Sequence, residues 1–175
     1  PYIRAVNYPY HINTQKIYAL HASQTGELWL GTDIGLLRFN GKRSKQIPFQ
    51  STRQSDVTLL QTDNKGRMWA MNFANQLFYL ENDTLKCWEH ADQLISKGQL
   101  LNYVFTKDHL WVMTHQAVMS FKQSTGERSM LYQDKQAIFH DMVEFRDTVW
   151  VLGQGQVWKF HDSGYQEALP HCFET

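Results

Sequence analysis

The sequence predicts an all-β fold, a β-propeller of four-stranded antiparallel blades with four blades present, and two observations lead to it. Four tryptophans, Trp29, Trp69, Trp111 and Trp150, recur at intervals of 40, 42 and 39 residues. Each lies in the same local pattern, in which an apolar run and a short polar turn come before the Trp and further apolar runs come after it. A period of about 40 to 45 residues is typical of propeller blades, because one blade cannot bury both of its faces without neighbours.

Three apolar runs in each repeat predict three strands, which we call a, b and c from the centre of the ring outward. These runs are residues 17–22, 27–32 and 36–39, then 57–62, 67–72 and 76–80, then 101–106, 110–114 and 117–121, then 142–145, 149–153 and 156–160. Apolar residues alternate along them and Gly, Asn and Asp bound them, which favours strands over helices. An aromatic residue returns ten positions after each Trp, namely Phe39, Tyr79, Phe121 and Phe160.

A fourth strand, d, is predicted after each trio because turn residues separate the third run from another apolar segment. The segments are residues 45–49, 84–88, 127–132 and 165–169, and Gly, Asn or Asp occupies the preceding turn in every case. Such residues suit the positive φ angles of tight hairpins. Pro48 lies in the first of these segments, and Pro is tolerated in a strand at a sheet edge, so we expect strand d to be outermost.

The predicted blades cover residues 17–50, 57–89, 100–133 and 138–169, and residues 1–16 form an N-terminal strand and lead-in segment. The short strand expected at residues 2–6 has no partner blade, because the fourth repeat already carries its own outer strand. The tail, residues 170–175, resembles the start of another connection between blades. We therefore expect the N-terminal part of a larger ring, and a self-contained four-bladed ring is the alternative.

Composition excludes several classes of protein. Lys plus Arg equals Asp plus Glu at 17 each, so the net charge is zero, which argues against nucleic-acid binding and against an electrostatic membrane anchor. No apolar stretch has the length of a transmembrane helix. The only two cysteines, Cys87 and Cys172, lie about two predicted blades apart, so we expect no disulfide between them. The eight histidines show no ligand spacing, and we expect no metal and no cofactor.

A family resemblance rests on residues 28–41, LWLGTDIGLLRFNG, which resemble the two-component regulator propeller repeat. Gly31, Thr32 and Gly35 occupy the Gly-Thr and Gly-Leu positions of that repeat. The resemblance covers the whole chain by period, but it is specific in the first repeat alone. The second and third repeats replace Gly-Thr by Met71-Asn72 and Met113-Thr114, and the fourth has no Thr after its Gly.

The resemblance implies the extracytoplasmic sensor of a hybrid two-component histidine kinase of the Bacteroidetes type. In that family two seven-bladed propellers precede an immunoglobulin-like domain, a transmembrane helix and a kinase. It implies a periplasmic or extracellular location, an oligosaccharide or other small ligand, a homodimeric receptor, and no catalysis by this fragment itself. Two alternatives stay open: a propeller enzyme acting on polysaccharide as a lyase or hydrolase, and a protein-interaction scaffold.

Candidate ligand residues lie in the b–c loops, which emerge with the d-to-a connections on one face of a propeller. They are Asp33, Asn72, Asn75, His115 and Gln154. Planar polar groups beside aromatic rings suit sugars, because amides and carboxylates can pair with adjacent hydroxyl groups. The other interpretation is that these side chains cap their own loops by Asx-type hydrogen bonds. The predicted channel-facing strands are mostly apolar, with His21, Thr58 and Gln61 as exceptions, which favours a receptor over an enzyme.

Overall fold

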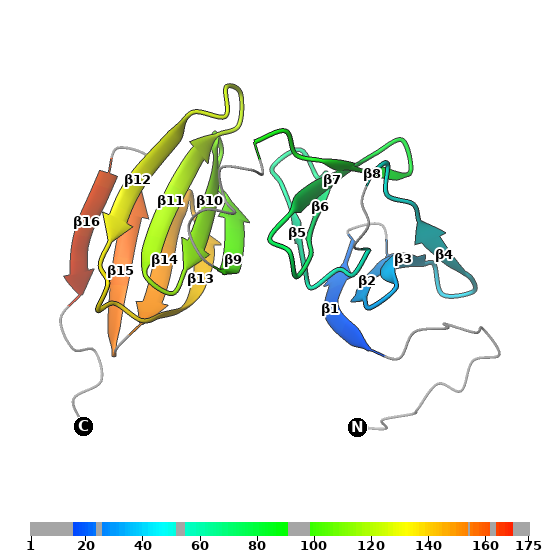
Figure 1. Ribbon diagram of the computed structural model, residues 1–175, viewed down its shortest axis with the longest axis horizontal. Helices are drawn as coiled ribbons and strands as arrows, with labels where there is room; N and C mark the ends of the chain where they lie inside the picture. Colours follow the sequence, from blue (N-terminus) through cyan, green and yellow to red (C-terminus); the bar gives the residue numbers. More distant parts are fainter. Residues whose placement is uncertain are drawn as a thin grey trace.

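The fold is a four-blade β-propeller built from four antiparallel four-stranded sheets (Figure 1). The computed structural model describes residues 16–23, 26–51, 55–90, 99–153, 155–161 and 164–169, the last of these by their backbone alone. The N-terminal strand predicted at residues 2–6 and the tail at 170–175 lie outside the described residues. Within the described ranges every regular element is a strand.

Each blade consists of four strands consecutive in the chain. Blade 1 contains β1 (Ile17–Ala22), β2 (Leu28–Thr32), β3 (Gly35–Phe39) and β4 (Ser44–Ile47), and blade 2 contains β5 (Leu59–Thr62), β6 (Met68–Met71), β7 (Leu77–Glu81) and β8 (Thr84–Cys87). Blade 3 contains β9 (Leu100–Phe105), β10 (His109–Thr114), β11 (Ala117–Lys122) and β12 (Arg128–Gln133), and blade 4 contains β13 (Phe139–Phe145), β14 (Thr148–Gly153), β15 (Gln156–His161) and β16 (Gly164–Leu169).

The strand order within every sheet follows the chain, so each blade is an up-and-down meander. The first strands of successive blades, β1, β5, β9 and β13, contact one another in sequence, and the fourth strands lie on the outside (Figure 1). The predicted outermost position of strand d is therefore confirmed for β4. Pro48 itself follows β4, and its carbonyl accepts a hydrogen bond from Leu85 N of the next blade at 2.8 Å.

Two predicted strand starts differ from the structure by more than one residue. Strand β5 begins at Leu59, two residues later than predicted, because Val57 N donates to Thr32 O of blade 1 and so belongs to the connection. Strand β13 begins at Phe139, three residues earlier than predicted, because a bulge between Phe139 and Asp141 lets the chain re-enter the ladder. Pattern alone misses both, since a bulge breaks the alternation of apolar and polar residues.

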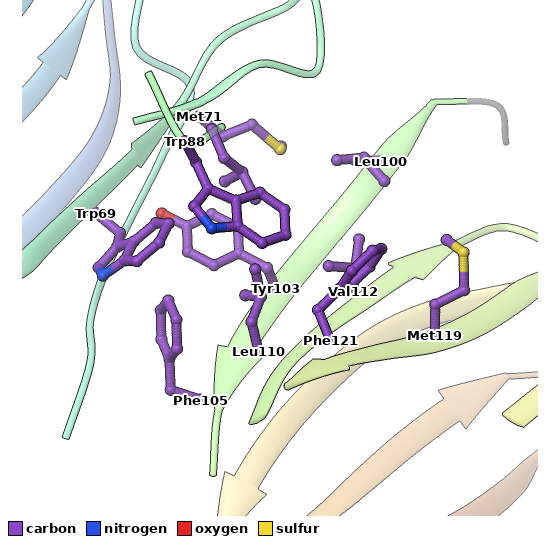
Figure 2. Close-up of a cluster of buried hydrophobic side chains, with 11 residues drawn as sticks. Trp69, Met71, Trp88, Leu100, Tyr103, Phe105, Leu110, Val112, Met119 and Phe121 are labelled. Atoms are coloured by element: carbon purple, nitrogen blue, oxygen red, sulfur yellow. The ribbon is translucent and has the colours of Figure 1, made fainter. Parts of the chain in front are cut away.

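Three apolar clusters fill the three contacts between successive blades. Trp29, Trp69 and Trp111 are all buried, and each packs against the blade that follows its own. Figure 2 shows the middle cluster, where Trp69 of blade 2 lies beside Phe105 of blade 3 with their ring centroids 5.1 Å apart. Burying roughly 200 Å² of one Trp at about 25 cal/mol per Å² contributes about 5 kcal/mol as an upper estimate. Blade–blade contacts thus supply much of the stability.

The recurring Trp of blade 2 is also held by a buried carboxylate. Asp63 Oδ2 accepts hydrogen bonds from Trp69 Nε1 and from Arg67 Nε, both at 2.9 Å, and its side chain is fully buried. Asp63 Oδ1 accepts from the backbone N–H groups of Lys65 at 3.0 Å and Arg67 at 2.9 Å, which closes the turn between β5 and β6. Blade 3 uses a neutral counterpart, because Trp111 Nε1 donates to Thr106 Oγ1 at 2.9 Å.

The ionised form of the Asp63 carboxylate is stabilised by its hydrogen-bond donors. Burial raises the pKa of the Asp63 carboxyl, but the hydrogen bonds from Trp69 and Arg67 outweigh it and hold that pKa below its ordinary value. The guanidinium of Arg67 in turn lies over the rings of Trp69 at 5.0 Å and Tyr79 at 4.8 Å, which adds cation–π attraction. Turn, ion pair and aromatic rings therefore form one network.

Candidate ligand-binding face

The turns from the second to the third strand of each blade lie on one face of the propeller together with the connections between blades. We call this the b–c face; the turn in blade 1 shows how the repeat motif builds it. Thr32 Oγ1 donates to Gly35 O at 2.8 Å and accepts from Ile34 N at 3.2 Å. Gly35 has a φ of 127°, which favours glycine, and a Cβ on Gly31 would lie 2.7 Å from Val57 O. The motif residues Gly31, Thr32 and Gly35 therefore shape the turn.

Asn72 occupies in blade 2 the position of Thr32 in blade 1, three residues after the Trp, and it performs the same task. Its Oδ1 accepts from Gln76 N and its Nδ2 donates to Gln76 Oε1, both at 2.9 Å, and the residue is buried. Asn75 has a φ of 60° and its Oδ1 accepts from Leu100 N at 3.2 Å, which ties the turn to blade 3. Both amides are thus engaged in loop structure.

The other predicted residues lie in the turns of other blades. Asp33 Oδ1 accepts from Lys16 N at 3.4 Å, and Asp33 is partly buried in the turn of blade 1. His115 is exposed in the turn of blade 3, with its Nδ1 3.3 Å from Phe139 O. Gln154 lies outside the described residues. The structure therefore brings Asn72 and Asn75 together in one turn, and it places Asp33 and His115 in separate blades.

A hollow of about 200 Å³ opens beside the turn of blade 2, where blade 3 begins. Asn72 and Asn75 line it, and the other lining residues are Thr58, Leu59, Met71, Phe73, Gln99, Leu100 and Leu101. Gln99 is exposed at its rim. The Asn72 amide faces its own turn, so the groups that remain for a ligand are the exposed amide of Gln99 and the apolar side chains.

The exposed ring of Phe73 lines this hollow and contacts the exposed ring of Tyr18, and neither residue was predicted from the sequence as a ligand contact. Phe73 is 54% exposed, and its ring centroid lies 5.2 Å from that of Tyr18 with the planes at 82°. The pair spans blades 1 and 2. Asp56 holds the backbone of Phe73, because the Phe73 N–H donates a hydrogen bond to Asp56 Oδ2 at 2.8 Å. An aromatic between the polar residues of a b–c turn was the available signal in the sequence.

A larger groove of about 1080 Å³ lies between blades 1 and 2 on the opposite face, which carries the turns between first and second strands. Its lining includes His21, Glu27, Asp63, Lys65, Arg67 and Asp83. None of the predicted ligand residues that the structure describes lies on this face. Its acids are largely paired: Asp63 is held as described above, and Asp83 contacts Lys45 Nζ at 2.8 Å and Arg38 at 3.1 Å.

Within the described ranges, the ionisable groups with a shifted pKa do not gather on the b–c face. A hydrogen bond from Lys45 and the charge of Arg38 lower the pKa of Asp83, and a hydrogen bond from Lys86 lowers that of Glu81. Both acids lie at the turn between β7 and β8. Among the described residues no three His, Cys, Asp or Glu side chains come together as a metal site requires. The described part of the chain also contains no helix long and apolar enough to cross a membrane.

Sequence comparisons identify no relative: no protein-family model matches this chain, and no curated protein matches it. Solved structures do match. The extracellular domain of BT3049 from B. thetaiotaomicron, described as a hybrid two component system, superposes with a TM-score of 0.64 and 14% identity over 90% of this chain. The extracellular domain of BT4673 from the same organism, described likewise, gives a TM-score of 0.58 and 12% identity over 91% of this chain.

A propeller enzyme matches equally well. Virginiamycin B lyase from Staphylococcus aureus, in an inactive form with quinupristin, gives a TM-score of 0.61 and 17% identity over 88% of this chain. This chain spans 25% of the BT3049 domain, 30% of the BT4673 domain and 54% of the lyase. At such identities the similarity establishes the propeller fold, which this chain shares with two-component sensor domains and with a lyase. It does not by itself assign a function.

Proposed function

We propose that this chain is a ligand-sensing part of the extracytoplasmic portion of a two-component sensor histidine kinase. It binds a glycan-derived ligand, and binding controls transcription through a downstream kinase. Two observations support this proposal: residues 28–41 resemble the repeat of such sensors, and extracellular domains of two hybrid two component systems share the fold. Further blades and downstream domains of the same polypeptide, a membrane anchor and a homodimeric receptor belong to the same proposal. The fragment itself has no catalytic role in it.

The observation that carries the ligand class is the exposed aromatic pair Tyr18 and Phe73 beside the hollow of blade 2. A sugar ring has an apolar face of C–H groups that can lie on an aromatic ring, while its hydroxyl groups need planar polar partners. Gln99 supplies an exposed amide at the rim of the same hollow. Asp33, His115 and Gln154 remain predicted contacts for a ligand large enough to reach neighbouring turns.

The proposal is tested by titrating a panel of oligosaccharides into the purified chain and measuring heat. Replacing Phe73→Ala removes one face of the platform, and we expect about 1 kcal/mol less binding free energy, or roughly a five-fold weaker Kd. Phe145 is the matched control, since it is a comparably exposed phenylalanine on β13 of blade 4. Equal affinity of the wild type and Phe73→Ala for every ligand that binds would exclude this site.

An enzyme is the second candidate, because a lyase shares the fold at similar coverage of this chain. A lyase or hydrolase would convert polysaccharide during incubation, whereas a sensor returns its ligand unchanged. Chromatography of the ligand after prolonged incubation distinguishes the two functions. New chain ends that depend on protein concentration would favour the enzyme. A scaffold without a small ligand would give no heat with any member of the panel.

A further inference from the structure

The polar side chains that line the hollow beside the turn of blade 2 are mostly engaged within the protein. Thr58 Oγ1 donates to a backbone carbonyl of the neighbouring strand β6 at 3.1 Å, and Asn75 Oδ1 accepts from the first backbone N–H of β9 at 3.2 Å. The Asn72 amide is bonded within its own turn at 2.9 Å. The exposed amide of Gln99 is therefore the polar side chain that the hollow offers to a ligand.

The floor of the hollow is apolar and is held in place by the core. Met71 and Leu100 line the hollow and also belong to the apolar cluster between blades 2 and 3, where they are buried (Figure 2). Leu59 packs against the same cluster from the first strand of blade 2. Because protein interiors are close-packed, a floor made of core residues keeps its shape. A hydroxyl group placed on this floor would lose its hydrogen bonds to water and gain none in return.

The lining carries no charge, which narrows the class of ligand further. None of the described residues that line the hollow is an acid, a lysine, an arginine or a histidine. A carboxylate, a sulfate or an ammonium group would lose its water there without meeting an opposite charge. The volume of about 200 Å³ is also below the roughly 300–1,000 Å³ of pockets that enclose a drug-sized ligand. The hollow therefore suits one neutral, largely apolar substituent of a ligand whose main body lies outside, on the exposed ring of Phe73.

We propose that the hollow binds the acetamido group of an N-acetylated sugar whose ring stacks on Phe73. The acetyl methyl group lies on the apolar floor, and the amide of the substituent pairs with the amide of Gln99, which can accept from an N–H or donate to a carbonyl. This inference rests on the proposed function, since it names the substituent that the same site selects. A sugar with a hydroxyl group at that carbon lacks the methyl group, and a free amino sugar carries a charge, so both bind more weakly.

Calorimetric titration of the chain with matched oligosaccharides tests the inference. Triacetylchitotriose, cellotriose and fully deacetylated chitotriose share one linkage and differ only in the group on the second carbon of each sugar, which is acetamido, hydroxyl or ammonium. N-Acetyllactosamine and lactose form a second matched set. We expect the N-acetylated member of at least one set to bind about 10-fold more tightly than its counterparts, because one additional methyl-sized group in an apolar pocket typically gives at least about that factor.

Two variants separate recognition of the substituent from stacking on the ring. Gln99→Leu changes an exposed side chain, so the fold is retained, and it should weaken the N-acetylated ligand by about five-fold while leaving the hydroxyl ligand unchanged. Phe73→Ala should weaken both ligands, because they share the ring that stacks. Gln133→Leu is the matched control, since Gln133 is an exposed glutamine on the outer strand β12 of blade 3.

The outcomes distinguish this inference from the proposed function. Equal affinities within both sets, or a loss in Gln99→Leu that is the same for modified and unmodified ligands, overturn the inference and leave the proposed function standing. Tighter binding of the deacetylated trimer than of the acetylated one overturns it as well, because the hollow would then favour a charge. Absence of binding by every member of both sets also overturns it. Absence of binding across the wider panel of oligosaccharides overturns the proposed function too.

Discussion

Replacing Asp63→Ala tests whether the buried carboxylate of blade 2 organises the contact between blades 2 and 3. The substitution removes the acceptor of four hydrogen bonds, two from backbone N–H groups, one from Arg67 Nε and one from Trp69 Nε1. Water can reach the partly exposed Arg67, but Trp69 is buried. Leaving buried donors unsatisfied costs about 1–3 kcal/mol each, so we expect a loss of about 3–5 kcal/mol in the free energy of unfolding.

The assay is urea-induced unfolding followed by tryptophan fluorescence. Asp63→Asn keeps the shape and one acceptor oxygen, but it turns an amide N–H₂ toward donors, so we expect an intermediate loss. Asp83→Ala is the control, because its ion pairs are exposed and such pairs contribute little to stability. If Asp63→Ala lowers the free energy of unfolding by less than about 1 kcal/mol, the carboxylate does not hold Trp69 in the way we describe.

The same network predicts a dependence on pH. The folded-state pKa of Asp63 lies below its ordinary value of about 3.9, so the ionised carboxylate stabilises the fold. This contribution is complete above the ordinary pKa and is lost as the pH falls through the lowered folded-state pKa. The difference in stability between wild type and Asp63→Ala should therefore shrink on acidification. An unchanged difference between about pH 6 and pH 2 would contradict the assignment.

Three further tests, with substitutions at four positions, probe the repeat. Gly31→Ala should destabilise the fold by about 2 kcal/mol or more, since the new Cβ would lie 2.7 Å from a backbone oxygen, and a melting temperature equal to that of the wild type would contradict this. Trp111→Phe should lower the free energy of unfolding by more than Trp150→Phe does, because the ring of Trp111 is fully buried and that of Trp150 is partly exposed. Equal losses in the free energy of unfolding, measured with urea, would contradict the packing described. Asn72→Ala should cost about 1 kcal/mol through loss of its turn bonds, and Asn72→Thr should recover part of it, as thermal unfolding of the three proteins would reveal.

The sequence predicted the blades well because a propeller repeats one local rule. The spacing of Trp29, Trp69 and Trp111 reflects the contact that each makes with the next blade, and strands such as β6, β10 and β11 are recognisable as continuous apolar runs because both of their faces are buried. Strand starts at connections were less accurate. The start of β5 is determined by the backbone hydrogen bond of Val57, and the start of β13 by the bulge before Asp141. Neither feature changes the amino-acid composition of its segment, so the sequence pattern does not reveal it.

The structural roles of the residues on the b–c face were harder to predict than the fold. Asn72 was predicted as a candidate ligand residue because it lies in a b–c loop. Alignment of the repeats places it where Thr32 stands, and its amide forms hydrogen bonds within the turn. The carboxylate network of Asp63 could not be foreseen, because it depends on where the Trp69 ring points. The contact between Tyr18 and Phe73 joins residues of different blades, which only the folded chain brings together.

The measurement that tests the proposed sensor most directly is NMR mapping of an oligosaccharide that binds the chain. The account predicts shifts and intermolecular proton contacts at Tyr18, Phe73 and Gln99 on the b–c face. Contacts confined to the groove on the opposite face, around His21 and Lys65, would contradict it. So would the failure of every oligosaccharide tested to perturb any residue of the folded chain.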